Sequence, residues 1–204
     1  MADRLDDQIG KGLAALKLST ELVEPLAHYI NLLHKWNKPY NLTAVRHPAD
    51  MVTKHVLDSL TLAPYLGSSK RLCDVGTGAG FPGLILALFN PEKSFVLVDG
   101  VSKKISFLQE MIGKLNLKNV IAVHTKVEQY NVAEQFDIII SRAFADIKKM
   151  TKLTSHLIKD GGKFIAMKGP DVMSELDDIS LPFVHHDISV PFLEGTRKII
   201  EIKN

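Results

Sequence analysis

A glycine-rich turn constrains the fold of this chain more than any other feature. Residues 74–83 read Asp-Val-Gly-Thr-Gly-Ala-Gly-Phe-Pro-Gly, between the apolar pair Leu72 and Cys73 and the apolar run 84–88. A strand that turns directly into a helix beside a ligand needs glycine, because a Cβ atom would block positive φ angles and close approach to the backbone. The turn therefore predicts the strand–turn–helix unit of an α/β fold, with a ligand at the turn.

The turn differs from the dinucleotide-binding fingerprint, whose third glycine would fall at position 81, where this chain has Phe81. Asp74 opens the turn, and the next apolar run, 94–98, ends in Asp99. An acid after a second parallel strand is placed to bind ribose hydroxyls, whereas Asp74 would repel a pyrophosphate and suits the ammonium group of an amino acid. The ligand that we infer is S-adenosylmethionine. The competing interpretation is a tight bend without a ligand.

The hydrophobic and periodic pattern predicts two regions. Residues 1–66 form a helical N-terminal extension, with helices over about 22–36, ended by Pro39, and over about 51–62. Residues 67–204 alternate strand and helix patterns, which predicts a seven-stranded doubly wound sheet. With the inferred S-adenosylmethionine, we expect this sheet to be a Rossmann-like methyltransferase domain. Helices are expected at 102–117, 147–158 and 171–179, and the later strands at 120–123, 136–141, 163–167, 183–190 and 196–202, the last two as a hairpin.

The composition argues against disulfides, metal sites and membrane-spanning segments in this chain. The single cysteine, Cys73, cannot form an intrachain disulfide or a cysteine-based metal cage, and the histidines lack a regular ligand spacing, so no metal is expected. The N-terminus has no signal-peptide pattern, and no apolar run approaches the ~18 residues of a membrane span. We expect a cytoplasmic monomer without a membrane partner.

Ligands of doubly wound sheets bind at the carboxyl ends of the strands. Five separate stretches follow predicted strands and are expected to face one crevice: 74–81, Asp99, 126–128, 141–142 and 168–169.

These stretches lack two motifs that other classes of methyltransferase use, which limits the kinds of atom that can accept the methyl group. Methylation of pyrimidine C5 usually needs a cysteine nucleophile, and Cys73 lies inside a strand. Exocyclic amines are commonly methylated with a D/N-P-P-Y/F box after the fourth strand, where this chain reads Ser-Arg-Ala-Phe over 141–144. A ring nitrogen such as guanine N7 is nucleophilic without a base, so positioning alone can suffice.

Basic and aromatic residues are interleaved in the extension. Lys35, Lys38, Arg46 and Lys54 accompany Trp36 and Tyr40 against the single acid Asp50, a composition that can bind a nucleic-acid backbone and stack bases. An ordinary solvated face with Trp36 as a core anchor is the alternative.

A further signal comes from short motifs that are spread over nearly the whole chain: 36–37, 41–43, 55–60, 74–83, 136–145, 168–169 and 195–197. Together these motifs resemble the RsmG (GidB) family of 16S ribosomal RNA guanine-N7 methyltransferases. The resemblance implies that Gly76 and Phe81 contact S-adenosylmethionine, that Val127 and Glu128 flank its adenine, and that Arg142 lies at its methionine end or beside the reacting base. Gly78 belongs to the same matched turn, which would hold the methionine part.

Some interpretations remain open at this point. Arg142 is either a residue of the active centre or half of a structural ion pair, and Asp58 is expected to brace the extension. Lys104 and Lys126 stand where the family usually has Arg, which leaves their RNA contacts undefined. The expected substrate is 16S ribosomal RNA or a small-subunit ribonucleoprotein; the alternatives are a methyltransferase for a small molecule or protein, and an RNA-binding protein without methyl transfer.

Overall fold

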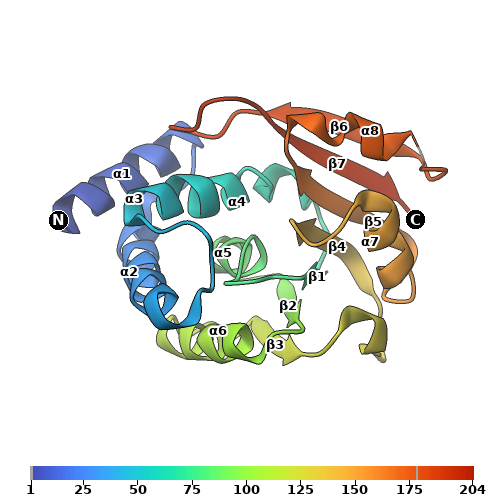
Figure 1. Cartoon of the computed structure of the whole chain (residues 1–204), viewed down its shortest axis with the longest axis horizontal. Helices are drawn as coiled ribbons and strands as arrows, with labels where there is room; N and C mark the ends of the chain where they lie inside the picture. Colours follow the sequence, from blue (N-terminus) through green and yellow to red (C-terminus); the bar gives the residue numbers. More distant parts are fainter. Residues whose placement is uncertain (1, 178) are drawn as a thin grey trace.

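The computed structural model describes residues 2–177 and 179–204, which form one seven-stranded sheet with helices on both faces (Figure 1). The strands are β1 (Arg71–Val75), β2 (Ser94–Asp99), β3 (Val120–His124), β4 (Phe136–Arg142), β5 (Ile158–Lys168), β6 (Phe183–Ile188) and β7 (Arg197–Lys203). Their spatial order is β3-β2-β1-β4-β5-β7-β6; β7 runs antiparallel to both β5 and β6, and the other adjacent pairs are parallel. The predicted doubly wound sheet and its terminal hairpin are confirmed.

The helices of the N-terminal extension lie together at one side of the sheet, where Figure 1 shows them in blue and cyan. They are α1 (Ala2–Ala15), α2 (Val23–Tyr40), α3 (Pro48–Met51) and α4 (Asp58–Leu60), the last two joined by a π-helical stretch (Val52–Leu57). The remaining helices are α5 (Gly83–Phe89), α6 (Ser102–Lys114), α7 (Ile147–Thr154) and α8 (Met173–Leu176). Among the described residues, no helix combines the length and apolar character needed to cross a bilayer.

Side chains of the central strands alternate between two apolar layers, because successive residues of a strand point to opposite faces. Leu72 and Leu97 pack with the extension and α5, whereas Cys73 and Val75 pack with α7 on the other face. The first layer runs without interruption from Ile9 of α1 into the sheet. Cys73 is fully buried, as its position inside the strand predicts.

Two predicted helix ends are wrong. The helix expected to stop at Pro39 continues to Tyr40, since a proline in the last turn removes only one backbone hydrogen bond, and Asn41 ends it with a left-handed φ of 49°. The helix expected over 147–158 stops at Thr154, and Ile158 already pairs with Phe136 as the first residue of β5.

A glycine pair, 161–162, separates the expected helix (147–158) from the expected strand (163–167) in the sequence, but in the structure it lies inside β5. The register of β5 against β4 shifts just there, and Gly161 has a φ of 71°. The acidic helix expected over 171–179 is also shorter: a 3₁₀ turn (Pro170–Val172) precedes the four-residue α8, and Asp178 lies outside the described residues.

Candidate active site

Two of the glycines in the turn between β1 and α5, Gly76 and Gly78, are needed for different structural reasons. Gly76 has a φ of 67°, and a Cβ atom there would lie 2.5 Å from the ring of Phe144, which packs on the turn. Gly78 has a φ of 63°, and the nearest neighbour of a Cβ would be 4.0 Å away. Gly76 is therefore required by packing, whereas the backbone at Gly78 is open to an approaching ligand.

The buried Asp74 side chain supports this turn through hydrogen bonds. Its Oδ2 accepts hydrogen bonds from the Thr77 hydroxyl and from the Gly83 N–H, both at 2.7 Å. Burial raises the pKa of the Asp74 carboxyl to about 7, although these two hydrogen bonds oppose the shift. Its Oδ1 is buried and has no hydrogen-bond partner among the described residues. Asp74 thus holds the turn against the start of α5 and does not line the hollows described next.

A hollow of about 290 Å³ lies beyond the ends of β1, β2 and β3. Asp99 contributes its carboxylate, which accepts hydrogen bonds from the N–H groups of Gly78 and Val101 at 2.9 Å and faces Lys104 Nζ at 3.3 Å. Val127 and Glu128 line the same hollow. The structure therefore brings together the carboxylate expected at the ribose and the pair expected at the adenine.

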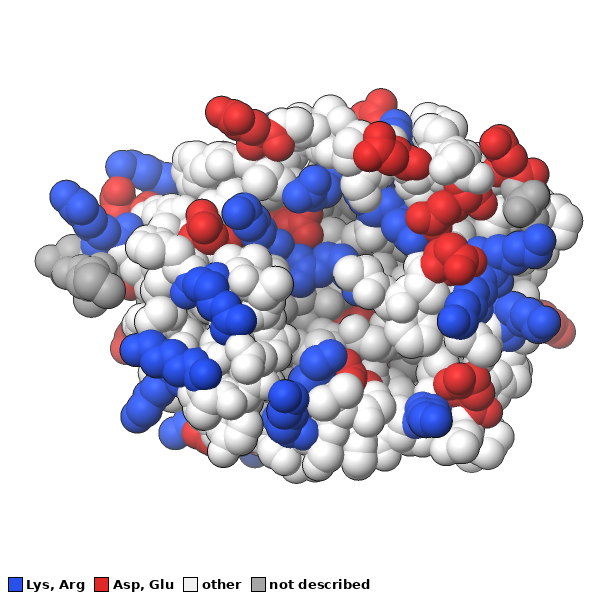
Figure 2. Space-filling view, viewed as in Figure 1, with Lys and Arg blue, Asp and Glu red and all other residues white. Residues whose placement is uncertain are grey.

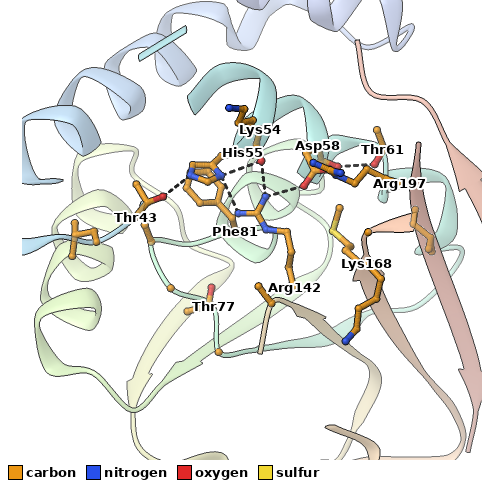
Figure 3. A pocket seen from close by; sticks show the side chains of 18 of the residues that line it. Thr43, Lys54, His55, Asp58, Thr61, Thr77, Phe81, Arg142, Lys168 and Arg197 are labelled. Atoms are coloured by element: carbon orange, nitrogen blue, oxygen red, sulfur yellow. Dashed lines mark hydrogen bonds and ion pairs between the residues drawn. The ribbon is translucent and has the colours of Figure 1, made fainter. Parts of the chain in front are cut away.

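A second hollow, of about 480 Å³, opens toward the extension. It shares Gly76, Lys104 and Ala143 with the first, so the two adjoin. Figure 3 shows its side chains converging from the extension, the glycine turn and the ends of β4, β5 and β7. Of the described residues that line it, the charged ones are six cations and one acid: Lys54, Lys104, Arg142, Lys168, Arg197, Lys198 and Asp58.

Arg142 joins the end of β4 to the extension. Its Nη1 donates to Asp58 Oδ2 and to the Lys54 carbonyl, both at 2.8 Å, and its guanidinium lies 5.3 Å from the centre of the Phe81 ring (Figure 3). Arg197 Nε lies 3.7 Å from Asp58 Oδ1. The structural ion pair left open by the sequence is thus present, and it lies inside the crevice: Arg142 braces the extension while lining the site.

His55 is stacked on Phe81, with ring centres 4.5 Å apart, and lies between Arg142 and Thr43. Burial and the adjacent Arg142 charge lower the pKa of His55 to about 3, so the imidazole is neutral at physiological pH. Its Nδ1 is 3.2 Å from Arg142 Nη2 and its Nε2 is 2.8 Å from Thr43 Oγ1. Both ring nitrogens are therefore engaged by protein groups.

All five predicted stretches reach this crevice, divided between its two hollows. Asp99 and residues 126–128 line the first, whereas Arg142, Lys168 and Gly169 line the second, and Gly76 lines both. Sequence reasoning did not select His55 for the site. The i, i+3 spacing of His55 and Asp58 on one helical segment was the available signal, because it places both side chains on one face.

Comparison with known proteins shows the family of this chain and its fold. The family model of GidB, described as rRNA small subunit methyltransferase G, matches residues 22–200. This chain belongs to that family. The ribosomal RNA small subunit methyltransferase G of Haemophilus influenzae (strain PittEE) is 44% identical over 193 residues, which cover 93% of this chain and 95% of the relative. The protein of the same name from Mannheimia succiniciproducens is 42% identical over 212 residues, covering 100% and 99%.

Solved structures show the same fold at low identity. A SAM-dependent methyltransferase from Aquifex aeolicus superposes with a TM-score of 0.61 at 17% identity, over 81% of this chain and 97% of its own. Magnesium protoporphyrin IX methyltransferase from Synechocystis, solved with bound SAM, gives 0.60 at 14% identity, over 86% and 96%. The fold is thus that of S-adenosylmethionine-dependent methyltransferases, and the family is that of rRNA small subunit methyltransferase G.

Proposed function

We propose that this GidB-family chain transfers a methyl group from S-adenosylmethionine to N7 of one specific guanine in 16S ribosomal RNA, acting on the RNA or on a small-subunit ribonucleoprotein. One observation carries the proposal. The first hollow, with the Asp99 carboxylate at the end of β2, adjoins the second hollow, whose described charged lining is six cations and one acid. The first hollow suits a nucleoside, and the second suits a nucleotide with its phosphates.

The residues present fit the cofactor. Asp99 offers carboxylate oxygens where ribose hydroxyls can donate, Val127 supplies an apolar wall for a purine, and the open backbone at Gly78 allows close approach. Gly76 and Phe81 form the wall toward the second hollow, and Glu128 the rim of the first. When bound, S-adenosylmethionine supplies an electrophilic methyl group, and the protein's task is to orient the acceptor nitrogen toward it.

The chemistry of the crevice favours an acceptor that needs no general base. Both nitrogens of His55 are engaged, and Asp58 is paired with Arg142. Asp74, whose pKa is near 7, is buried beneath the turn. Guanine N7 carries a free lone pair and no proton to remove, so orientation beside Arg142 is sufficient for methyl transfer.

The charged surface supports an RNA substrate. Lys and Arg side chains gather on the face where Figure 1 places α2 and α6, around the central hollow (Figure 2). Lys35 and Lys38 of α2, Arg46 and the aromatic Tyr40 are all exposed. Trp36 packs against Phe107 with ring centres 5.6 Å apart, which fits the anchor role that the sequence left as its alternative.

The proposal is tested with labelled S-adenosylmethionine and small subunits, assembly intermediates or naked RNA from a strain that lacks the enzyme. We expect label in N7-methylguanosine, detected by mass spectrometry of nucleosides.

Asp99→Ala should weaken cofactor binding in calorimetry at least tenfold. Charge reversal at Lys35, Lys38, Arg46 and Lys54 should abolish labelling without changing cofactor affinity. Absence of N7 label with every RNA form would contradict the proposal, and full activity after charge reversal would favour a small-molecule or protein substrate.

A further inference from the structure

Tyr29 is a residue of the extension that reaches the glycine turn. It lies in α2, is fully buried, and its hydroxyl donates a hydrogen bond to the carbonyl of Ala79, 50 positions along the chain. Burial raises the pKa of the Tyr29 phenol well above its usual range, so the hydroxyl keeps its proton and acts as a donor. Ala79 itself lines the crevice.

The Tyr29 ring supports the same turn through a second contact. It meets the Phe81 ring edge to face, with ring centres 5.5 Å apart and planes at 88°. It also packs against Phe107 of α6, with ring centres 5.9 Å apart. Aromatic pairs of this geometry are favourable beyond the area that they bury. Tyr29 therefore holds both the backbone of the turn and the aromatic side chain that lines the crevice.

The other supports of the turn come from the catalytic domain. Asp99 accepts the Gly78 N–H, and Asp74 accepts the Thr77 hydroxyl. Ala79 lies between two glycines with positive φ, Gly78 and Gly80, where the backbone is least restricted. Its carbonyl is thus the point where an additional hydrogen bond most reduces the freedom of the turn, and the extension provides that bond.

We propose that Tyr29 is a positioning residue for the cofactor: its hydroxyl fixes Ala79, and with it the glycine turn, in the conformation that receives S-adenosylmethionine. The extension then contributes directly to cofactor affinity, besides any contact with RNA. This inference rests on the proposed function only in the use of S-adenosylmethionine and not on the acceptor atom.

The substitution Tyr29→Phe in the full chain tests this role, since it keeps the ring and removes only the hydroxyl. Calorimetric titration with S-adenosylmethionine should show a Kd raised about tenfold, which corresponds to about 1.4 kcal/mol. Hydrogen exchange of the amides at residues 78–80 should become faster, because the turn has lost its restraint. At saturating cofactor the methylation rate should stay close to that of the wild type.

Thr154→Val is the matched control, because it also removes a buried hydroxyl that donates to a backbone carbonyl, that of Met150 in α7 at 2.8 Å. It should leave the Kd unchanged. Equal weakening by both variants would overturn the proposal in favour of a general loss of stability, and an unchanged Kd for Tyr29→Phe would refute it.

Phe107→Leu, which frees the Tyr29 ring, should raise the Kd by a smaller factor even if Tyr29→Phe folds poorly. A wild-type chain that binds no S-adenosylmethionine would instead remove the proposed function.

Discussion

Gly76 shows most directly how a single residue type is fixed by its surroundings. Its φ of 67° lies in the left-handed region, and the Phe144 ring occupies the position of any added Cβ. Phe144 follows Ala143, whose own φ of 54° turns the chain after β4 back toward the glycine turn. The two loops thus fit together only when one of them lacks a side chain.

Gly76→Ala should therefore destabilise the protein by at least ~2 kcal/mol, from backbone strain and from displacement of Phe144. Urea unfolding measures this directly. Gly113→Ala is the matched control: Gly113 is an exposed position of α6 with nothing within 4 Å of an added Cβ. It should raise stability by ~0.5–1 kcal/mol, since alanine is the better helix former. Equal effects at both sites would contradict the packing explanation.

At the scale of elements, the end of β4 and the extension are joined by a largely buried ion pair. The Asp58 side chain is 6% exposed and that of Arg142 18%, and their atoms approach to 2.8 Å. Removing one partner of such a pair leaves the other charge buried without compensation, which costs more than the pair itself contributes.

Asp58→Ala and Arg142→Ala should each destabilise the protein by about 3 kcal/mol, whereas the double variant should lose much less than their sum. A double-mutant cycle on urea-unfolding free energies gives the coupling, which we expect to exceed ~1 kcal/mol. The exposed pair Asp7–Lys11 of α1, whose charged atoms approach to 2.7 Å, serves as a control, and we expect its coupling to be close to zero. Additive losses at Asp58 and Arg142 would show that they act independently.

At the scale of the whole molecule, the extension and the catalytic sheet share one apolar layer, which runs from α1 to β7. Two buried titratable groups, His55 in the crevice and Asp74 beneath the glycine turn, respond to pH in opposite directions. The pKa of His55 falls from its ordinary 6.5 to about 3, and that of Asp74 rises from its ordinary 3.8 to about 7.

The sign of each contribution follows from proton linkage. His55 contributes stability that is complete above pH 6.5 and is lost as the pH falls toward 3. Asp74 contributes stability that is complete below pH 3.8 and is lost as the pH rises to about 7. Each slope is on the order of 1.4 kcal/mol per pH unit. Where the two intervals overlap, between about pH 3.8 and 6.5, the slopes of stability against pH from His55 and Asp74 oppose each other.

His55→Gln should therefore make stability fall with rising pH between about 4 and 6.5, relative to wild type, and Asp74→Asn should make it rise. Urea unfolding at several pH values across this window checks both. Identical pH slopes in the wild type and both variants would show that neither group titrates differently on folding.

Sequence periodicity predicted the fold well because the strands are either continuous apolar runs or bounded by glycine and proline. It failed at Gly161 and Pro39, where breakers lie inside an element: a register shift absorbs Gly161 within β5, and the last turn of α2 tolerates Pro39. Local signals cannot distinguish a glycine at a boundary from one at a bulge.

The sequence by itself determined the doubly wound sheet, the glycine turn and the acid at the end of β2, because these depend on periodicity and on residue types that the backbone demands locally. Only the tertiary structure decided how the extension meets the site: the Tyr29 hydroxyl on Ala79, His55 on Phe81, and Asp58 with Arg142. These contacts join residues 26 to 84 positions apart, and their strength comes from burial that no local pattern encodes.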